Sequence, residues 1–201
     1  MPKQTFFNLS SEKKNRIVQG AKEVFAHKHY SKVTIDSIVE TANIPKGSFY
    51  QYFYNKDDLF KHIFSDIGTD KSNLLFGITT ESTESFGELI SRMISESYKF
   101  ENRDETMVAL KDRFLKECPQ SVKEEILADL MPTTMKLFET IIEVFVAKGD
   151  FREDIDIRAA AFTLTSALLN IEKYSDEEGF NYGGAVIDIC STMELGLAKY
   201  D

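Results

Sequence analysis

The polar side chains that could do chemistry in this chain gather in residues 46–56, and the chemistry they suit is recognition of a nucleic-acid duplex. Gln51 can form two hydrogen bonds with the edge of an adenine, and Tyr52 can contact a thymine methyl group or a phosphate. Lys46 and Lys56 stand at the two ends of the stretch, where each can neutralise a phosphate.

Residues 34–54 contain the two short helices that would position these groups. Thr34 suits the N-cap of the first helix, because its hydroxyl can accept a backbone N–H of the following turn. Asn43-Ile44-Pro45 ends that helix, since the residue before a proline is pushed out of the α region. We expect the second helix over residues 46–54. The pattern predicts a helix-turn-helix, a unit that places its second helix in the DNA major groove.

The second helix has one side for packing and other sides for recognition. Phe49 and Phe53 lie four residues apart and can dock on the first helix. Gly47 and Ser48 keep the side chains small near the helix N-terminus, where free N–H groups favour an anion. The alternative is that the tyrosines of this helix simply cover a surface.

The flanking segments complete a small helical head. Residues 11–29 place Ile17, Ala21 and Val24 on one helical face, with Ser10 or Ser11 as a plausible cap. Asn55 can cap a further helix that starts with two carboxylates in its positive first turn. A three-helix head followed by a long connecting helix is therefore expected.

The run from residue 17 to residue 64 resembles the DNA-binding head of the TetR family of bacterial transcriptional regulators. The matching residues are Phe25, Tyr30, Thr34, Ile38, Ala42, Ile44, Gly47 to Phe53, Asn55, Lys56 and Leu59. Their combined spacing is specific, although each piece alone is a weak signal. The chain departs from the family at His29-Tyr30, where glycine is common, so the loop after the first helix is expected to bend differently.

Carried over residue by residue, this resemblance implies a set of DNA contacts. Phosphate contacts are implied for Thr34, Tyr52 and Lys56. Base or groove contacts are implied for Lys46, Gly47, Ser48, Tyr50 and Gln51.

Charge changes sign along the chain. Residues 1–64 carry ten Lys/Arg and six Asp/Glu, about +4, which leaves fourteen and twenty-seven, about −13, for the rest of a chain whose net charge is −9. A basic head on an acidic body orients a molecule on a polyanion, so the net acidity does not argue against a double-stranded DNA operator as partner.

The remaining sequence reads as one helix after another. The expected segments are 56–76, 84–101, 104–117, 120–147, 156–174 and 181–199. Pro132 lies inside the fourth of these and should kink or divide it. The predicted fold is all-α, with a helix-turn-helix DNA-binding domain in residues 1–55 and a helical ligand-binding and dimerisation domain in residues 56–201.

The last two helices are the expected homodimer interface. The penultimate helix is apolar nearly all round, so it must be buried on more than one side. One interpretation is a central core helix within one subunit; the resemblance favours a four-helix bundle formed by two subunits. The candidate interface residues are Phe162, Leu168, Ile187 and Met193. A homodimer would present two recognition helices to successive major grooves of a near-palindromic operator.

The resemblance also implies a pocket for a small hydrophobic effector in the body. The candidate lining residues, for each of which plain core packing is the more common role, are Met93, Phe100, Met107, Phe114, Phe138 and Phe145. A repressor of this kind releases DNA when the effector favours a spacing of the heads that no longer fits both half-sites. The helix that starts at Lys56 is the expected lever.

Other classes of protein find little support in the sequence. The three histidines and two cysteines form no metal-ligand or nucleophile pattern, so we expect no enzyme activity, no cofactor and no metal. No run of about 18 apolar residues and no signal-peptide pattern is present, so we expect no membrane association and a cytoplasmic location. The alternative to a DNA-binding regulator is a helical small-molecule-binding or interaction protein without sequence-specific DNA binding.

Overall fold

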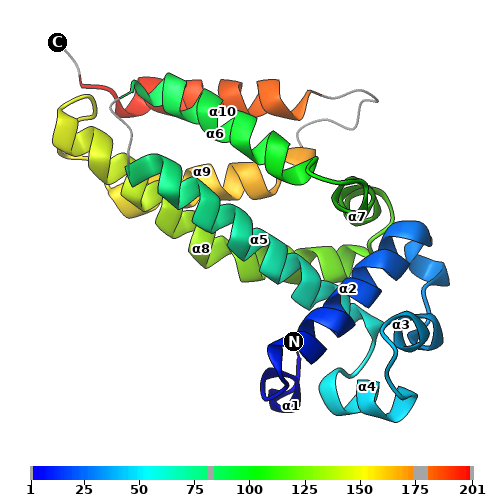
Figure 1. Cartoon of the computed structure of the whole chain (residues 1–201). Helices are drawn as coiled ribbons and strands as arrows, with labels where there is room; N and C mark the ends of the chain where they lie inside the picture. The colour runs from blue at the N-terminus through cyan, green and yellow to red at the C-terminus, as the bar shows by residue number, and fades with distance from the viewer. Residues whose placement is uncertain (1, 81–83, 174–180, 200–201) are drawn as a thin grey trace. The chain divides into compact units, whose positions relative to one another are not determined.

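The computed structural model describes residues 2–80, 84–173 and 181–199, and these residues are almost entirely helical (Figure 1). The helices are α1 (Gln4–Phe7), α2 (Ser11–His27), η1 (Tyr30–Lys32), α3 (Ile35–Thr41), α4 (Lys46–Tyr52), α5 (Lys56–Thr80), α6 (Phe86–Glu101), α7 (Glu105–Lys116), α8 (Gln120–Lys148), α9 (Ile157–Leu169), η2 (Ile171–Lys173) and α10 (Tyr182–Leu197). In the described ranges the one extended pairing is an isolated antiparallel bridge between Phe151 and Ala198. The all-α prediction is confirmed.

The predicted segments agree with the observed helices to within a few residues. The segment expected over 156–174 ends earlier as an α-helix, at Leu169, and continues as the short η2; residue 174 lies outside the described part of the chain. The four-residue helix α1 was not predicted, because its sequence is too short to show a helical period. No helix in the described part of the chain is both long and apolar enough to cross a membrane.

Pro132 does not divide α8. The helix runs without interruption from Gln120 to Lys148 with Pro132 inside it. A proline in this position lacks the N–H that would bond to the carbonyl four residues earlier, but the neighbouring turns hold the helix on both sides. Of the two predicted effects, a kink or a division, the division does not occur; the kink stays a prediction.

The chain forms two compact units. Unit 1 is Met1–Gly68 with Phe100–Ile126, and unit 2 is Thr69–Lys99 with Leu127–Asp201. The predicted boundary at residues 55 and 56 does not coincide with this division, because the start of α5, all of α7 and the start of α8 pack with the N-terminal helices. Assignment of DNA binding to residues 1–55 and of ligand binding to residues 56–201 stays a prediction.

Unit 1 is built around the helix-turn-helix of α3 and α4. Thr34 caps α3 as expected, with its hydroxyl oxygen accepting the Ser37 N–H at 3.2 Å and Ser37 bonding back to the Thr34 N–H. The turn passes through Asn43 in the left-handed region, φ 49°, which asparagine tolerates better than most residues. Gly20 of α2 lies against this turn, where a Cβ would come within 2.8 Å of the Ala42 nitrogen, so a glycine is needed for close packing of α2.

The cores of the two units are separate sets of buried apolar side chains. In unit 1, the predicted packing face of α2 is confirmed, since Ile17, Ala21, Val24 and Phe25 are all buried. In unit 2, α5, α6, α8, α9 and α10 contribute to one core cluster. Its aromatic part is formed by the rings of Phe86, Phe145 and Phe151, with centroids 5.3–5.4 Å apart.

Candidate nucleic-acid interface

Helix α4 separates a packing face from an exposed face. Phe49 and Phe53 are fully buried, as the sequence predicted. On the other side, Lys46, Gly47, Tyr50 and Gln51 are exposed. Residues three or four positions apart are neighbours on the surface of an α-helix. Lys46 with Tyr50, Gly47 with Tyr50 and Gly47 with Gln51 are such pairs, so the four residues form a single continuous surface. We call this surface the exposed face of α4.

Lys46 is held at this surface by Asp36 from the first turn of α3. Its ammonium lies 2.7 Å from the carboxylate, and this hydrogen bond and charge raise the pKa of Lys46. Both side chains are more than half exposed, at 53% and 69%, so the pair adds little to stability. An ammonium has three donors, so Lys46 can keep Asp36 and still reach a phosphate.

The other residues predicted to contact DNA differ in their exposure to solvent. Thr34 is exposed and Ser48 is half-buried. Tyr52 is only 5% exposed, and its ring packs near Phe6, with the centroids 6.3 Å apart. The predicted phosphate contact of Tyr52 would have to come from the small part of the side chain that remains accessible, and it stays a prediction.

Lys56 has a structural role that the sequence did not indicate. Its ammonium donates hydrogen bonds to the backbone oxygens of Tyr30, at 2.7 Å, and Val33, at 3.0 Å. These two carbonyls belong to the loop that leads directly into Thr34 and α3. Lys56 therefore fastens the start of α5 to the entry of the helix-turn-helix, and its phosphate contact stays a prediction.

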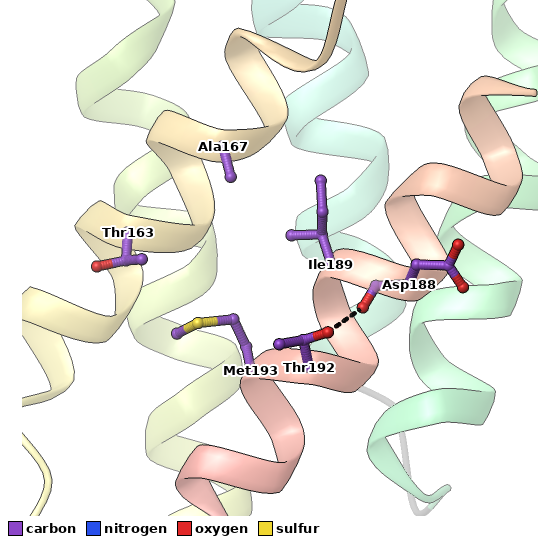
Figure 2. Close-up of a pocket in the computed structure, with 6 residues that line it drawn as sticks. All are labelled: Thr163, Ala167, Asp188, Ile189, Thr192 and Met193. Carbon is purple, nitrogen blue, oxygen red and sulfur yellow. Dashed lines mark hydrogen bonds between the residues drawn. The ribbon is translucent and has the colours of Figure 1, made fainter. Parts of the chain in front are cut away.

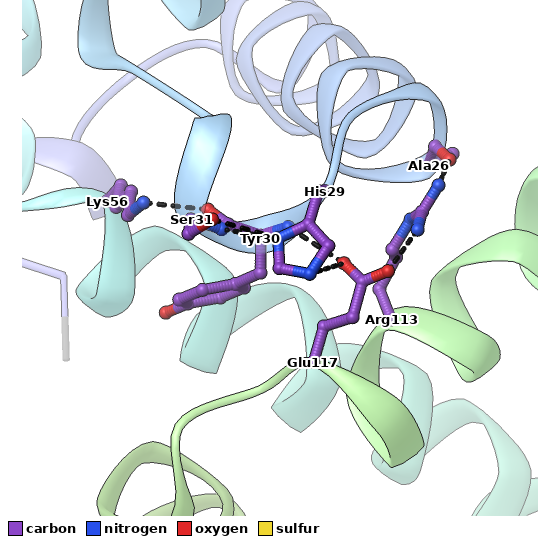
Figure 3. Close-up of polar contacts among 7 residues, drawn as sticks. All are labelled: Ala26, His29, Tyr30, Ser31, Lys56, Arg113 and Glu117. Atoms are coloured by element: carbon purple, nitrogen blue, oxygen red, sulfur yellow. Dashed lines mark hydrogen bonds and ion pairs between the residues drawn. The ribbon is translucent and has the colours of Figure 1, made fainter.

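Tyr30 joins this loop to three helices. Its ring is buried between Phe25 and Phe60, with centroids at 5.8 and 4.9 Å. Its hydroxyl donates to Asp57 at 2.6 Å, and burial followed by this carboxylate raises the pKa of Tyr30, so the hydroxyl keeps its proton. Its backbone N–H donates to the carboxylate of Glu117 at 2.8 Å, at the C-terminus of α7 (Figure 3).

Glu117 and Arg113 form a polar junction between α7 and the loop after α2 (Figure 3). They form an ion pair with each other; Arg113 also donates to the Ala26 oxygen at 3.5 Å, and His29 Nε2 lies 3.7 Å from Glu117. Partial burial alone would raise the pKa of Glu117, but the Tyr30 N–H, Arg113 and His29 together hold it below its usual range. Sequence reasoning missed this junction, because nothing in the order of residues brings position 117 to position 30.

Comparison with known proteins finds similarity to bacterial transcriptional regulators. Residues 17–63 match the family model described as bacterial regulatory proteins, tetR family. A fatty acid metabolism regulator protein of Bacillus subtilis (strain 168) is 22% identical to the chain over 79% of the chain and 85% of its own length. The HTH-type transcriptional repressor KstR2 of Rhodococcus jostii (strain RHA1) is 23% identical, covering 75% of the chain and 73% of the repressor. The family match, which covers less than half of the chain, and these relatives support a TetR-family transcriptional regulator.

Solved structures with a similar fold cover most of the chain. FadR from Bacillus subtilis, in complex with stearoyl-CoA, has a TM-score of 0.62 and 17% identity over 90% of this chain and 98% of that chain. SmeT, the repressor of a Stenotrophomonas maltophilia multidrug efflux pump, has a TM-score of 0.65 and 16% identity over 96% and 93%. At these identities the similarity shows a shared fold, and the similar proteins are themselves named as transcriptional regulators.

The six predicted effector contacts fall into two groups in the structure. Met93, Phe138 and Phe145 are buried in the core of unit 2, whereas Phe100, Met107 and Phe114 belong to unit 1. Phe114 stacks on Phe64, with the ring centroids 4.8 Å apart. Each side chain has packing partners of its own, so an effector role for these residues stays a prediction.

The predicted interface residues lie on α9 and α10, where some side chains are exposed and others pack inward. Phe162 is 55% exposed and Ile187 is 42% exposed. Leu168 and Met193 are half-buried and pack against the core of unit 2. Between the two helices lies an open hollow of about 220 Å³ (Figure 2). Its lining is Thr163, Ala167, Asp188, Ile189, Thr192 and Met193.

The junction at Glu117 predicts a pH-dependent contribution to stability. A carboxylate whose folded pKa is depressed stabilises the fold above its unfolded pKa, near 4.5, and loses this effect as the pH falls through the folded value. Glu117→Gln should lower the free energy of unfolding by about 1 kcal/mol at pH 7, the scale of one typical hydrogen bond, because the amide keeps an acceptor but loses the charge. The difference from wild type should shrink as the pH falls below about 4.5 and through the lowered folded pKa.

Urea unfolding at pH 3, 4, 5 and 7 measures this difference. Glu143→Gln, at an exposed position of α8, is the matched control and should differ little from wild type at each pH. A Glu117→Gln difference of the same size at pH 3 and pH 7 would contradict the role of the charge.

Proposed function

We propose that this TetR-family regulator is a repressor that binds a near-palindromic operator as a homodimer and is released by a small hydrophobic effector. The observation that carries the proposal is the exposed face of α4, which combines Lys46, Tyr50 and Gln51 on a helix whose opposite side is buried. Two similar proteins, KstR2 and SmeT, are named as repressors, which supports repression over activation.

The chemistry of this face supports reading of bases in the major groove. The Gln51 amide can donate to and accept from one adenine edge, and such a bidentate pair discriminates against the wrong base by about 1–3 kcal/mol. Lys46 and the exposed Thr34 stand beside it with groups that suit phosphates. Residues 1–64 carry ten Lys/Arg against six Asp/Glu, which favours approach of this part of the chain to DNA.

Exposed apolar side chains on α9 and α10 support the homodimer. Phe162, Ile187 and Leu195 are 55%, 42% and 76% exposed, an unusual concentration of large apolar side chains on two neighbouring helices. A second copy that covers them would form an isologous four-helix interface. The two α4 helices of the dimer would then contact half-sites about one turn of the DNA helix apart, roughly 34–36 Å.

Release by an effector needs a route from the body to α4. Helix α5 runs without a break from Lys56, which bonds the Tyr30 and Val33 carbonyls, to Thr80 in unit 2. The Arg113–Glu117 junction of α7 holds the same loop from another element. An effector that prefers one arrangement of these helices by about 1–3 kcal/mol would shift the population of heads that fit both half-sites.

The effector that we propose is a compound with a large apolar part. FadR of Bacillus subtilis was crystallised with stearoyl-CoA, and the similar sequence from this organism is named as a fatty acid metabolism regulator protein. These names make a long-chain acyl thioester the first probe to offer this protein, ahead of the lipophilic cation that the acidic charge of residues 65–201 would favour.

Base reading by Gln51 is tested by selection from a random duplex pool. The wild-type protein should enrich a near-palindromic sequence, and Gln51→Ala should lose its preference at one position of each half-site, about 5–150-fold in discrimination. Gln120→Ala is the control, since Gln120 bonds Glu124 within α8. Failure of the wild-type protein to enrich any sequence would favour the alternative of a helical interaction or small-molecule-binding protein.

The homodimer is tested with a charge at Phe162, because this side chain is 55% exposed and its replacement spares the core. Leu168 is a poorer site, since it packs against the core of unit 2 and a charge there would damage the subunit itself. Sedimentation should show dimers for the wild-type protein and monomers for Phe162→Glu. The control Tyr98→Glu, at a 67% exposed aromatic on α6, should remain dimeric; dimeric Phe162→Glu would place the interface elsewhere.

A further inference from the structure

The C-terminal end of α4 is completed by residues from another part of the chain. Helix α4 has no basic side chain in its last turn, and Tyr54 directs its N–H to Asp58, at 3.2 Å, instead of back into the helix. The carbonyls at positions 50, 51 and 52 therefore need donors from elsewhere. A helix of seven residues is too short to keep its last turn without such support.

Residues 3–5 supply all three donors. The Lys3 backbone N–H donates to the Tyr52 oxygen at 2.8 Å, and the Lys3 ammonium donates to the Tyr50 oxygen at 2.7 Å. The Thr5 hydroxyl donates to the Gln51 oxygen. Three consecutive carbonyls of α4 thus bond to a tripeptide almost fifty positions earlier, and the Lys3 charge lies at the negative end of the helix.

Phe6 anchors this segment to unit 1. Its side chain is 1% exposed, and its ring centroid lies 4.9 Å from that of Phe53 and 5.0 Å from that of His62 in α5. The Lys3 ammonium also sits 4.1 Å from the ring centroid of Tyr54. The segment is therefore fixed by buried aromatic packing at one end and by a cation over a ring at the other.

We propose that Lys3, Thr5 and Phe6 are positioning residues for the recognition helix, acting on DNA binding through α4. The proposal rests on the proposed function, in which Tyr50 and Gln51 contact a duplex. The carbonyls that Lys3 and Thr5 bond belong to these same two residues. A recognition side chain must be held to within about half an ångström, so loosening its backbone weakens binding without removing a contact.

Thr5→Val is the most direct test, because it removes one hydroxyl and no charge. We expect about 3–10-fold weaker binding to a duplex selected by the wild-type protein, the effect of losing one hydrogen bond. The slope of affinity against salt should not change, since no phosphate contact is lost. In the absence of DNA, amide hydrogen exchange in residues 50–54 should be faster in Thr5→Val than in the wild-type protein. Thr5→Ser keeps the hydroxyl and should match the wild-type protein in both DNA affinity and amide exchange.

Thr140→Val is the matched control. The Thr140 hydroxyl donates to the Lys136 oxygen within α8, so its loss should change neither DNA affinity nor exchange in residues 50–54. Lys3→Met and its conservative partner Lys3→Arg give a second pair, in which the arginine keeps a donor and a charge. Sedimentation should give the same assembly for all variants and the wild-type protein.

The results that overturn the proposal differ from those that overturn the proposed function. Wild-type affinity and unchanged exchange in Thr5→Val would show that residues 3–6 do not position α4. A salt slope lowered by about one in Lys3→Met, with Thr5→Val silent, would make Lys3 a phosphate ligand and also overturn it. If the wild-type protein selects no duplex, the proposed function fails. Faster amide exchange in Thr5→Val would then still show that residues 3–6 hold α4 in place, and unchanged exchange would reject this.

Discussion

Burial of one side of α4 is the constraint on which the rest of this structure depends. The helix has seven residues, and helices of this length do not hold their shape in water. Phe49, Tyr52 and Phe53 therefore have to be covered, and their packing with the neighbouring helices decides which way the opposite side points. The exposed face of α4 is a consequence of this packing, because a rotation of the helix would expose a phenylalanine and bury Lys46 or Gln51 at a large cost.

The same packing explains why unit 1 is larger than the helix-turn-helix. The loop that enters α3 has backbone N–H and C=O groups beside the buried Tyr30 ring, and these groups need hydrogen-bond partners. Lys56 at the start of α5 donates to the Tyr30 oxygen, and Glu117 at the end of α7 accepts from the Tyr30 N–H. Elements that belong by sequence to the body thus complete the head, so a rearrangement of α5 or α7 has a direct mechanical route to the start of the recognition unit.

The features that the sequence predicted are those set by local rules. Thr34 as a cap, the turn before Pro45 and the buried face of α2 follow from propensities and periodicity, and the structure confirms them. Contacts between distant positions could not be predicted in this way. The roles of Glu117 and Lys3 depend on which backbone groups the fold leaves without partners, and only the packed structure reveals those groups. For the same reason, charge and family resemblance predict Lys56 only as a phosphate contact, and its bonds to the Tyr30 and Val33 carbonyls cannot be predicted from them.

Cross-linking from the exposed face of α4 tests the central claim most directly. A photoreactive phenylalanine analogue at position 50, which is 46% exposed, would be compared with the same group at position 98, which is 67% exposed on α6. With a duplex selected by the wild-type protein, the account predicts cross-links to bases in both half-sites from position 50 and none from position 98. The absence of base cross-links from position 50, or equal cross-linking from both positions, would contradict it.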